Sequence, residues 1–302
     1  TNVRMRIDGT LFLTTEIPKN LHAPLIARIK ILSGMDIAEK RRPQDGRILI
    51  KVGGKKMDMR VSTLPSIFGE KAVLRLLDQD NEHIGIEKLG FEHGQAEKLR
   101  QVITAPHGII LVTGPTGSGK STTLYSLLEL INKPEVNIIT IEDPVEYTIP
   151  GLTQVQINEK IDVTFGSALR SILRQDPDKL MVGEIRDQET AHLAVRVALT
   201  GHLVLSTLHT NDAPASINRL VDMGIPNFLI ASSIRCIVAQ RLVRKLCPNC
   251  KKEMNVTQEM AKEIKMPEGA KIYAPVGCAS CRFTGYRDRK STRLNSSHIT
   301  IS

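Results

Sequence analysis

The sequence predicts an α/β protein built on a parallel sheet, and two features of the chain support this fold class. Short, continuous apolar runs alternate with stretches of helical periodicity from about residue 95 to 245. Such runs are typical of parallel strands that helices cover on both faces. A glycine-rich segment directly follows the first run and precedes a helical stretch. The four runs are residues 109–112, 138–141, 180–182 and 203–206.

The first part of the chain has a different pattern, which predicts a smaller α+β domain over residues 1–77. Residues 3–13 alternate around Asp8-Gly9, as expected of a β-hairpin. Apolar residues then recur at helical spacing over 22–38, with Gly34 as the expected stop. Alternation returns in three stretches, 47–52, 56–62 and 72–77.

Composition indicates an ordinary globular protein and excludes few functions. The 302 residues are 41% hydrophobic and 24% charged, with a formal charge of +9 that suits nucleotides, nucleic acid or an anionic membrane equally well. Aromatic residues make up only 3%, which argues against a nucleic-acid reader built on stacking. There is no apolar run of the roughly 18 residues that a membrane span needs, and no signal-peptide layout. We therefore expect a cytoplasmic protein.

The glycine-rich segment has the form of a phosphate-binding loop, G-x-x-x-x-G-K-S. Its strand–loop–helix context makes a chance glycine turn the weaker interpretation. Glycines let successive amides turn toward an anion, and the following helix adds partial positive charge at the same point. Lys120 is expected to reach the β- and γ-phosphates of ATP, and the Ser121 hydroxyl to ligate Mg²⁺. The predicted nucleotide-binding residues are Gly114, Pro115, Thr116, Gly117, Ser118, Gly119, Lys120, Ser121 and Thr122.

Hydrolysis also needs a carboxylate, and acidic residues follow two of the apolar runs. Glu184 comes directly after the run at 180–182 and Gly183, so it should lie where parallel sheets bind ligands. It is the leading candidate for polarising water or holding Mg²⁺ through water; a helix cap is the alternative. The cluster from Glu142 to Glu146 follows another run, and Pro144 keeps its carboxylates in a loop. One of its three carboxylates is expected to assist.

Histidines and arginines supply further candidates with open alternatives. His202 and His209 flank the run at 203–208. Either could sense a γ-phosphate or be a satisfied core histidine, and we favour His209. Arg170 and Arg174 are four apart on a helix expected over 165–174, so they should share a face. They could neutralise charge as arginine fingers or line a solvated face.

Two Cys-x-x-Cys pairs predict a structural metal site. Each spacing lets two thiolates meet one ion, and four thiolates close a tetrahedral Zn²⁺ site with no open position. A redox dithiol is the rival, but two matched pairs favour zinc and a reducing compartment. Cys236 lies among apolar residues and is expected to be a core thiol. The predicted zinc ligands are Cys247, Cys250, Cys278 and Cys281.

Taken together, these motifs resemble the secretion ATPases that drive type II secretion and type IV pilus assembly, over about residues 3–287. The resemblance implies a RecA-like P-loop NTPase core, a smaller preceding domain and a homo-hexameric ring that turns ATP hydrolysis into motion. The motifs are G-P-T-G-S-G-K-S-T at 114–122, I-E-D-P-V-E-Y at 141–147, L-R-Q-D-P-D-K-L-M-V-G-E-I-R-D at 173–187, T-G-H-L-V-L-S-T-L-H-T-N at 200–211 and A-Q-R-L-V-R-K-L-C-P-N-C at 239–250.

The resemblance also implies roles for individual residues. Glu184 would be the catalytic glutamate, Glu142 would assist it, and His202 and His209 would fall in the family's histidine motif. Four arginines resemble those that approach the γ-phosphate. Two of them lie in the preceding domain; the set is Arg47, Arg60, Arg170 and Arg174.

Partners follow from the same resemblance. We expect an inner-membrane platform protein and an adaptor, peripheral attachment to the inner membrane through them, and no direct nucleic-acid partner. The four-cysteine module resembles that of the assembly and secretion ATPases and separates this chain from pilus-retraction and conjugation relatives.

The chain departs from the family pattern near both ends. Thr1 falls inside the expected first domain, and the acidic-histidine motif that precedes it in the family is absent. The family's usual G-Y-R-G-R reads G-Y-R-D-R at 285–289, and residues 291–298 resemble a vector-derived translation. The missing C-terminal helices put ring formation by this chain in question. The expected divisions are 1–77 (partial α+β domain), 78–94 (linker), 95–245 (ATPase core), 246–287 (zinc subdomain) and 288–302 (non-native tail).

The function that these features favour is a Mg-ATP-hydrolysing motor for pilus or pseudopilus assembly. Glu184 and Glu142 beside the phosphate loop are the reason. A regulatory nucleotide-binding scaffold with little turnover is one alternative. A DNA-translocating ATPase of the same broad fold is another, and stimulation of turnover by DNA at moderate salt would distinguish it.

Overall fold

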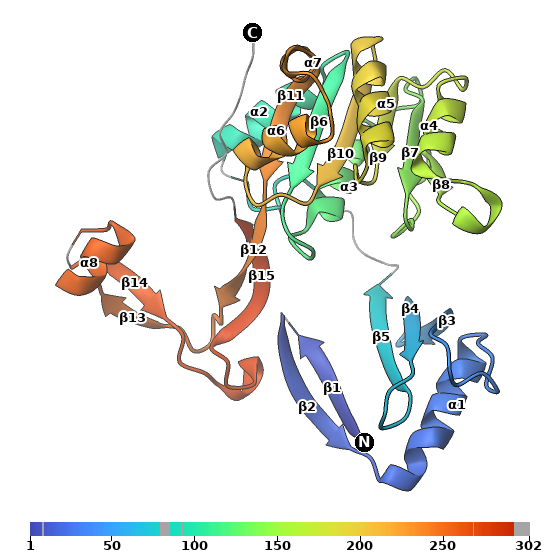
Figure 1. Cartoon of the computed structure of the whole chain (residues 1–302). Coiled ribbons are helices and arrows are strands. Elements are labelled where there is room, and N and C mark those ends of the chain that lie inside the picture. The colour runs from blue at the N-terminus through green and yellow to red at the C-terminus, as the bar shows by residue number, and fades with distance from the viewer. Residues whose placement is uncertain (8, 79–84, 92, 268, 293–302) are drawn as a thin grey trace. The chain divides into compact units, whose positions relative to one another are not determined.

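The computed structural model describes residues 1–7, 9–78, 85–91, 93–267 and 269–292 (Figure 1). The chain forms two compact units, Thr1–His83 and Ile84–Ser302. The division falls inside the stretch 78–94 predicted as a linker, of which residues 79–84 and 92 lie outside the described residues. Asp8 of the predicted hairpin turn and residues 293–302 of the predicted tail lie outside them as well.

The first unit is an α+β structure with a small core. A hairpin of β1 (Asn2–Ile7) and β2 (Thr10–Glu16) precedes the short 3-10 helix η1 (Lys19–Leu21) and α1 (His22–Leu32). An antiparallel sheet follows in the order β3 (Gln44–Val52), β4 (Lys55–Leu64), β5 (Lys71–Asp78). The core side chains come from α1, the loop after it and one face of this sheet: Met35, Ile48 and Val61, with Ile29, Ile50 and Met59.

Helix α1 is shorter than the sequence predicts. The expected helix over 22–38 ends at Leu32, and the Ser33 amide closes it by donating to the carbonyl of Ile29 at 3.0 Å. Gly34, the expected stop, follows with a φ of 71°. This left-handed conformation suits glycine and breaks the helical hydrogen-bond pattern. Residues beyond it form a loop instead of a further helical turn.

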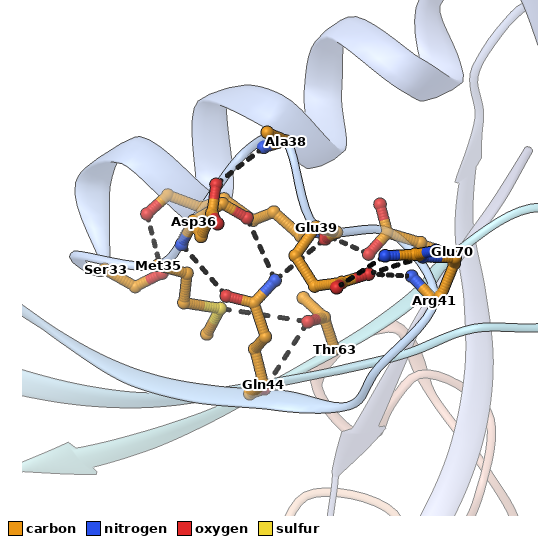
Figure 2. A network of polar contacts seen from close by, with 10 residues as sticks. Ser33, Met35, Asp36, Ala38, Glu39, Arg41, Gln44, Thr63 and Glu70 are labelled. Carbon is orange, nitrogen blue, oxygen red and sulfur yellow. Dashed lines mark hydrogen bonds and ion pairs between the residues drawn. The ribbon is translucent and has the colours of Figure 1, made fainter.

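A network of polar contacts fixes this loop against α1 (Figure 2). The Gln44 side chain donates to the carbonyls of Asp36 and Glu39, both at 2.9 Å, and accepts the Asp36 amide at 2.9 Å. Lys30 is only 1% exposed, and its ammonium donates to the Glu39 carbonyl at 2.7 Å. The same ammonium pairs with Glu70 at 2.5 Å. Lys30 therefore joins the helix, the loop and the β4–β5 turn.

We predict that Lys30→Met destabilises the first unit by about 3–5 kcal/mol, because it leaves the Glu70 carboxylate buried without its cation. Urea unfolding of the chain measures this change. Arg41→Ala is the control: it removes an arginine that is 89% exposed from its pair with Glu39, and it should change stability little. Equal stability of the two variants would contradict the argument.

The second unit contains a six-stranded sheet in which all neighbouring strands are parallel. The four apolar runs of the sequence form its centre, as predicted, and the two edge strands were not predicted. β8 is short and polar, so its sequence lacks an apolar run. The strands, in spatial order, are β11 (Ile234–Ala239), β6 (Gly108–Thr113), β10 (Leu203–Leu208), β9 (Lys179–Val182), β7 (Ile138–Glu142) and β8 (Thr153–Gln156).

Helices cover both faces of this sheet (Figure 1). One core layer holds Ile109, Leu111 and Val204 with residues of α4 (Phe165–Ile172), α5 (Gln188–Leu199), α6 (Ala213–Asp222) and α7 (Asn227–Ser233). The opposite layer holds Ile110, Val112 and Leu205 with residues of α2 (His93–Ile103) and α3 (Lys120–Ile131). Successive strand residues point to opposite layers, which explains why these strands are apolar throughout. The 3-10 helix η2 (Glu159–Ile161) lies in the β8–α4 connection.

The chain leaves this sheet after β11. β12 (Arg241–Leu246), which the sequence analysis placed at the end of the core, instead pairs antiparallel with β15 (Tyr286–Thr292). Residues 288–292 of the predicted tail are thus part of a two-stranded antiparallel sheet. Between the two strands lie β13 (Lys252–Asn255), α8 (Gln258–Ile264), β14 (Lys271–Ala274) and the 3-10 helix η3 (Ala279–Cys281). Within the described part of the chain, no helix combines the length and apolar character needed to cross a membrane.

Candidate nucleotide site and four-cysteine site

The glycine-rich loop joins β6 to α3 at the carboxyl edge of the sheet. Its glycines have positive φ angles, 148° at Gly114, 78° at Gly117 and 87° at Gly119. Side chains rarely tolerate this conformation, so the sequence needs glycine at these positions. The loop ends on the first turn of α3, whose free amides and dipole favour an anion. The Ser118 hydroxyl is buried and has no hydrogen-bond partner among the residues that the structure describes.

Lys120 folds back across this loop. Its ammonium donates to the carbonyls of Gly114 at 2.9 Å and Pro115 at 3.3 Å, and its side chain is buried. Burial lowers the pKa of Lys120, and the negative charge of Glu184 opposes that shift. The ammonium therefore interacts electrostatically with the predicted catalytic carboxylate. The loop, Lys120 and the orphaned Ser118 hydroxyl fit a polyphosphate with its counter-cation.

Glu184 lies just beyond β9, and His209 directly follows the neighbouring strand β10. Its carboxylate is held from two sides, by Arg186 at 2.5 Å and by Nε2 of His209 at 3.3 Å. The Glu184 side chain is 13% exposed, so it is sheltered yet reachable. The Thr207 hydroxyl donates to the Gly183 carbonyl at 2.8 Å and ties the two strand ends together. The structure brings Glu184 and His209 together, as strand-end positions predict.

His202 lies at the other end of the same strand. Its Nδ1 atom contacts the Val197 carbonyl at 3.2 Å and the Thr200 hydroxyl at 3.3 Å. Its backbone carbonyl accepts the Gly108 amide at the amino end of β6. The two histidines therefore occupy opposite edges of the sheet, and only His209 faces the candidate site.

Glu142 ends β7 and is 4% exposed. One carboxylate oxygen accepts the Thr140 hydroxyl at 2.5 Å and the Gln154 amide at 3.1 Å, and the other accepts the Tyr125 hydroxyl. Burial and the charge of Glu142 raise the pKa of Tyr125, so this phenol stays protonated and donates. Both oxygens of Glu142 are thus engaged by the protein. Sequence analysis did not identify Tyr125 or Gln154. These residues lie on α3 and β8, and only the fold brings them into contact with Glu142.

The predicted arginine pair differs in part from expectation. Helix α4 ends at Ile172, so Arg174 lies in the following turn and not on the helix predicted over 165–174. Arg170 pairs with Glu189 on α5, and Arg174 donates to the Arg170 carbonyl at 3.1 Å. The partners of both guanidinium groups therefore lie on α4 and α5.

In the first unit, Arg47 and Arg60 are cross-strand neighbours. Arg60 lies directly opposite Arg47 on β3 and opposite Arg75 on β5. Residues that face each other across strands project from the same side of a sheet, so the three arginines form a row. Asp58 accepts from Arg47 at 2.7 Å, and that contact raises the pKa of the guanidinium. Sequence analysis missed Arg75, because register is not visible in strand patterning.

The four cysteines of the two Cys-x-x-Cys pairs form one cluster. Their sulfur atoms all lie within 4.8 Å of one another, with Cys247 and Cys278 at 3.9 Å and Cys250 and Cys281 at 3.8 Å. Burial opposes ionisation of Cys281, but the amides of Cys278 and Gly285 donate to its sulfur and lower its pKa to about 6. Amide donors stabilise the thiolate form of cysteine, which is the form that binds a metal ion. Four such ligands fit a tetrahedral Zn²⁺ ion.

The chain is similar in sequence to known proteins over most of its length. The sequence profile of the family described as "Type II/IV secretion system protein" matches residues 1–293. The chain belongs to this family. It is 53% identical over 290 residues to a putative type II secretion system protein E of Escherichia coli K12, covering 95% of this chain and 59% of that protein. It is 51% identical to the type II secretion system ATPase E of Vibrio cholerae, covering 95% and 58%.

The family also includes pilus proteins. The chain is 51% identical over 293 residues to the type IV pilus assembly ATPase PilB of Myxococcus xanthus, covering 95% of this chain and 52% of that protein. The crystal structure of the pilus retraction motor PilT with bound ADP has a TM-score of 0.62 at 33% identity, covering 81% of this chain and 73% of PilT. The chain thus spans between half and three fifths of the length of these curated relatives. The parallel sheet with helices on both faces and the similarity to PilT confirm the predicted fold class, an α/β protein with a RecA-like core.

We predict one zinc ion per chain and its loss in Cys247→Ser, because three remaining thiolates no longer close the tetrahedron. Elemental analysis of the purified protein measures the metal. Cys236→Ser is the control: it replaces a buried thiol of β11 outside the cluster and should keep the metal. Full zinc occupancy in Cys247→Ser would refute the assigned ligands.

Proposed function

We propose that this chain carries the Mg²⁺-dependent ATPase site of a motor for pilus or pseudopilus assembly at the cytoplasmic face of the inner membrane. The observation that carries the proposal is Glu184 at the same sheet edge as the phosphate loop, close enough to Lys120 to affect its pKa. A loop alone would bind nucleotide, whereas a sheltered carboxylate beside it can orient attacking water. The names of the relatives, which include ATPases of type II secretion and of pilus assembly, support the same function.

Binding is assigned to residues 114–122. The loop amides and the Lys120 ammonium would hold the β- and γ-phosphates, and the Ser121 hydroxyl would ligate Mg²⁺. A Mg²⁺ ion held there would supply positive charge to stabilise the transferring phosphoryl group. Lys120 would exchange its contacts with the Gly114 and Pro115 carbonyls for phosphate oxygens, which satisfy the ammonium more strongly.

Catalysis is assigned to Glu184, with His209 and Glu142 in supporting roles. Glu184 accepts a hydrogen bond from the attacking water and aims its oxygen at the terminal phosphorus. Arg186 and His209 fix the carboxylate from two sides, so that little reorientation is needed in the transition state. Glu142 acts as a positioning residue, because its bonds with Tyr125 and Gln154 hold the end of β7 in place.

Arginines would supply the remaining charge. We assign Arg170 and Arg174 of the core, and the row of the first unit, to transition-state neutralisation, as arginine fingers do in related NTPases. In a homo-hexameric ring such residues can reach the site of a neighbouring copy. An inner-membrane platform protein and an adaptor would then couple the ring to the assembly machine. The row comprises Arg47, Arg60 and Arg75.

We predict that Glu184→Gln in the full-length oligomer lowers phosphate release from Mg-ATP by at least about 100-fold, because the amide cannot accept a proton from water. Nucleotide affinity should stay close to that of the parent protein. Glu135→Gln, an exposed position before β7, is the matched control and should keep full turnover. Unchanged turnover in Glu184→Gln would remove Glu184 from the mechanism.

A further inference from the structure

Gln240 is a buried residue that contacts both ends of the phosphate loop. It follows β11 at the point where the chain turns into β12, and it is 2% exposed. Its backbone amide donates to the Thr113 carbonyl at 2.8 Å, directly before the loop. Its side-chain amide donates to the Ser118 carbonyl at 2.8 Å, and its side-chain oxygen accepts the Thr123 hydroxyl at 2.7 Å. One residue thus binds the strand, the loop and α3.

Gln240 also packs closely against two glycines of the loop. A Cβ atom placed on Gly114 would lie 2.3 Å from the Gln240 carbonyl oxygen, and one on Gly119 would lie 2.7 Å from its side-chain nitrogen. Gln240 therefore packs directly behind the loop. A side chain at Gly114 or Gly119 would clash with it, which is one reason why these positions need glycine. Gln240 lies 117 residues from Thr123 and 122 residues from Ser118 along the chain, so local sequence does not reveal these contacts.

The hydrogen bond to Ser118 has a directional consequence. In a trans peptide the carbonyl and the following N–H point in opposite directions within one plane. Since the Ser118 carbonyl points at Gln240, the Gly119 N–H points away from Gln240. The Ser118 carbonyl can only accept, so the Gln240 side-chain nitrogen faces it, and the Gln240 side-chain oxygen is left to accept the Thr123 hydroxyl. The side chain is thereby held as a donor to this carbonyl.

We propose that Gln240 is a positioning residue for phosphate binding: it holds the loop from behind and orients the Gly119 amide toward the nucleotide. The inference rests on the proposed function, because it assumes that the loop binds phosphate. Three residues of the loop with positive φ would otherwise sample many conformations, and a pre-formed site avoids the entropy of ordering them on binding. Gln240 is not expected to contact the nucleotide.

The test compares variants that keep size but change hydrogen bonding. Gln240→Met removes both side-chain bonds, and Gln240→Glu keeps the bond from Thr123 but turns a carboxylate oxygen toward the Ser118 carbonyl. Affinity for ADP and ATP is measured by calorimetry, and thermal unfolding is measured in parallel. We expect at least about tenfold weaker binding for both variants, because Gln240→Met loses two hydrogen bonds of about fivefold each and Gln240→Glu loses one and adds repulsion between two oxygens. Acidification should partly restore Gln240→Glu relative to the parent protein, because a protonated carboxyl can donate again.

Thr123 provides a second, independent pair in case a Gln240 variant fails to fold. Thr123→Ser keeps the hydroxyl donor and should bind nucleotide within about twofold of the parent, whereas Thr123→Val keeps the shape and should bind about fivefold less tightly. Parent-like affinity in both Gln240→Met and Thr123→Val would overturn the inference while leaving the proposed function intact. A parent protein that binds neither ADP nor ATP would instead overturn the proposed function, and this inference with it.

Discussion

The site depends on one constraint, the backbone conformation of the loop between β6 and α3. Positive φ angles at three glycines let the chain turn sharply enough for α3 to begin directly beside the strand it covers. Lys120 stabilises the turn by donating to two carbonyls of the same loop. Glu184 and His209 follow strands that end at the same edge of the sheet as this loop, and Glu142 is the last residue of another such strand.

Strand order explains which residues meet there. β10 lies between β6 and β9, so the ends of these three strands bring the phosphate loop, His209 and Glu184 to adjacent positions. β7 is the next strand beyond β9 and ends in Glu142, whose buried hydrogen bonds fix that corner. After β11 the chain leaves the sheet at Gln240, which lies behind the loop and directly precedes β12, the strand that leads to the four cysteines.

Sequence analysis predicted the features that depend on local residue patterns. It missed the features that depend on strand register or on contacts between residues far apart in the chain. The apolar runs predicted the four central strands, and their ends predicted the meeting of Glu184 with the loop. The pattern could not predict that Gln240 faces Ser118 from more than a hundred residues away, or that Arg75 stands opposite Arg60. It also extended α1 past Leu32, because apolar spacing continues while Gly34 turns the backbone.

The most direct test of the central claim is a calorimetric titration of the protein and its Lys120→Ala variant with Mg-ATP. The account predicts binding by the parent and at least about tenfold weaker binding by Lys120→Ala, since a charge-assisted hydrogen bond to phosphate is lost. Lys133→Ala, an exposed lysine just beyond α3, should bind as the parent does. Equal affinity of the parent and Lys120→Ala would contradict the assignment of the loop as the phosphate site.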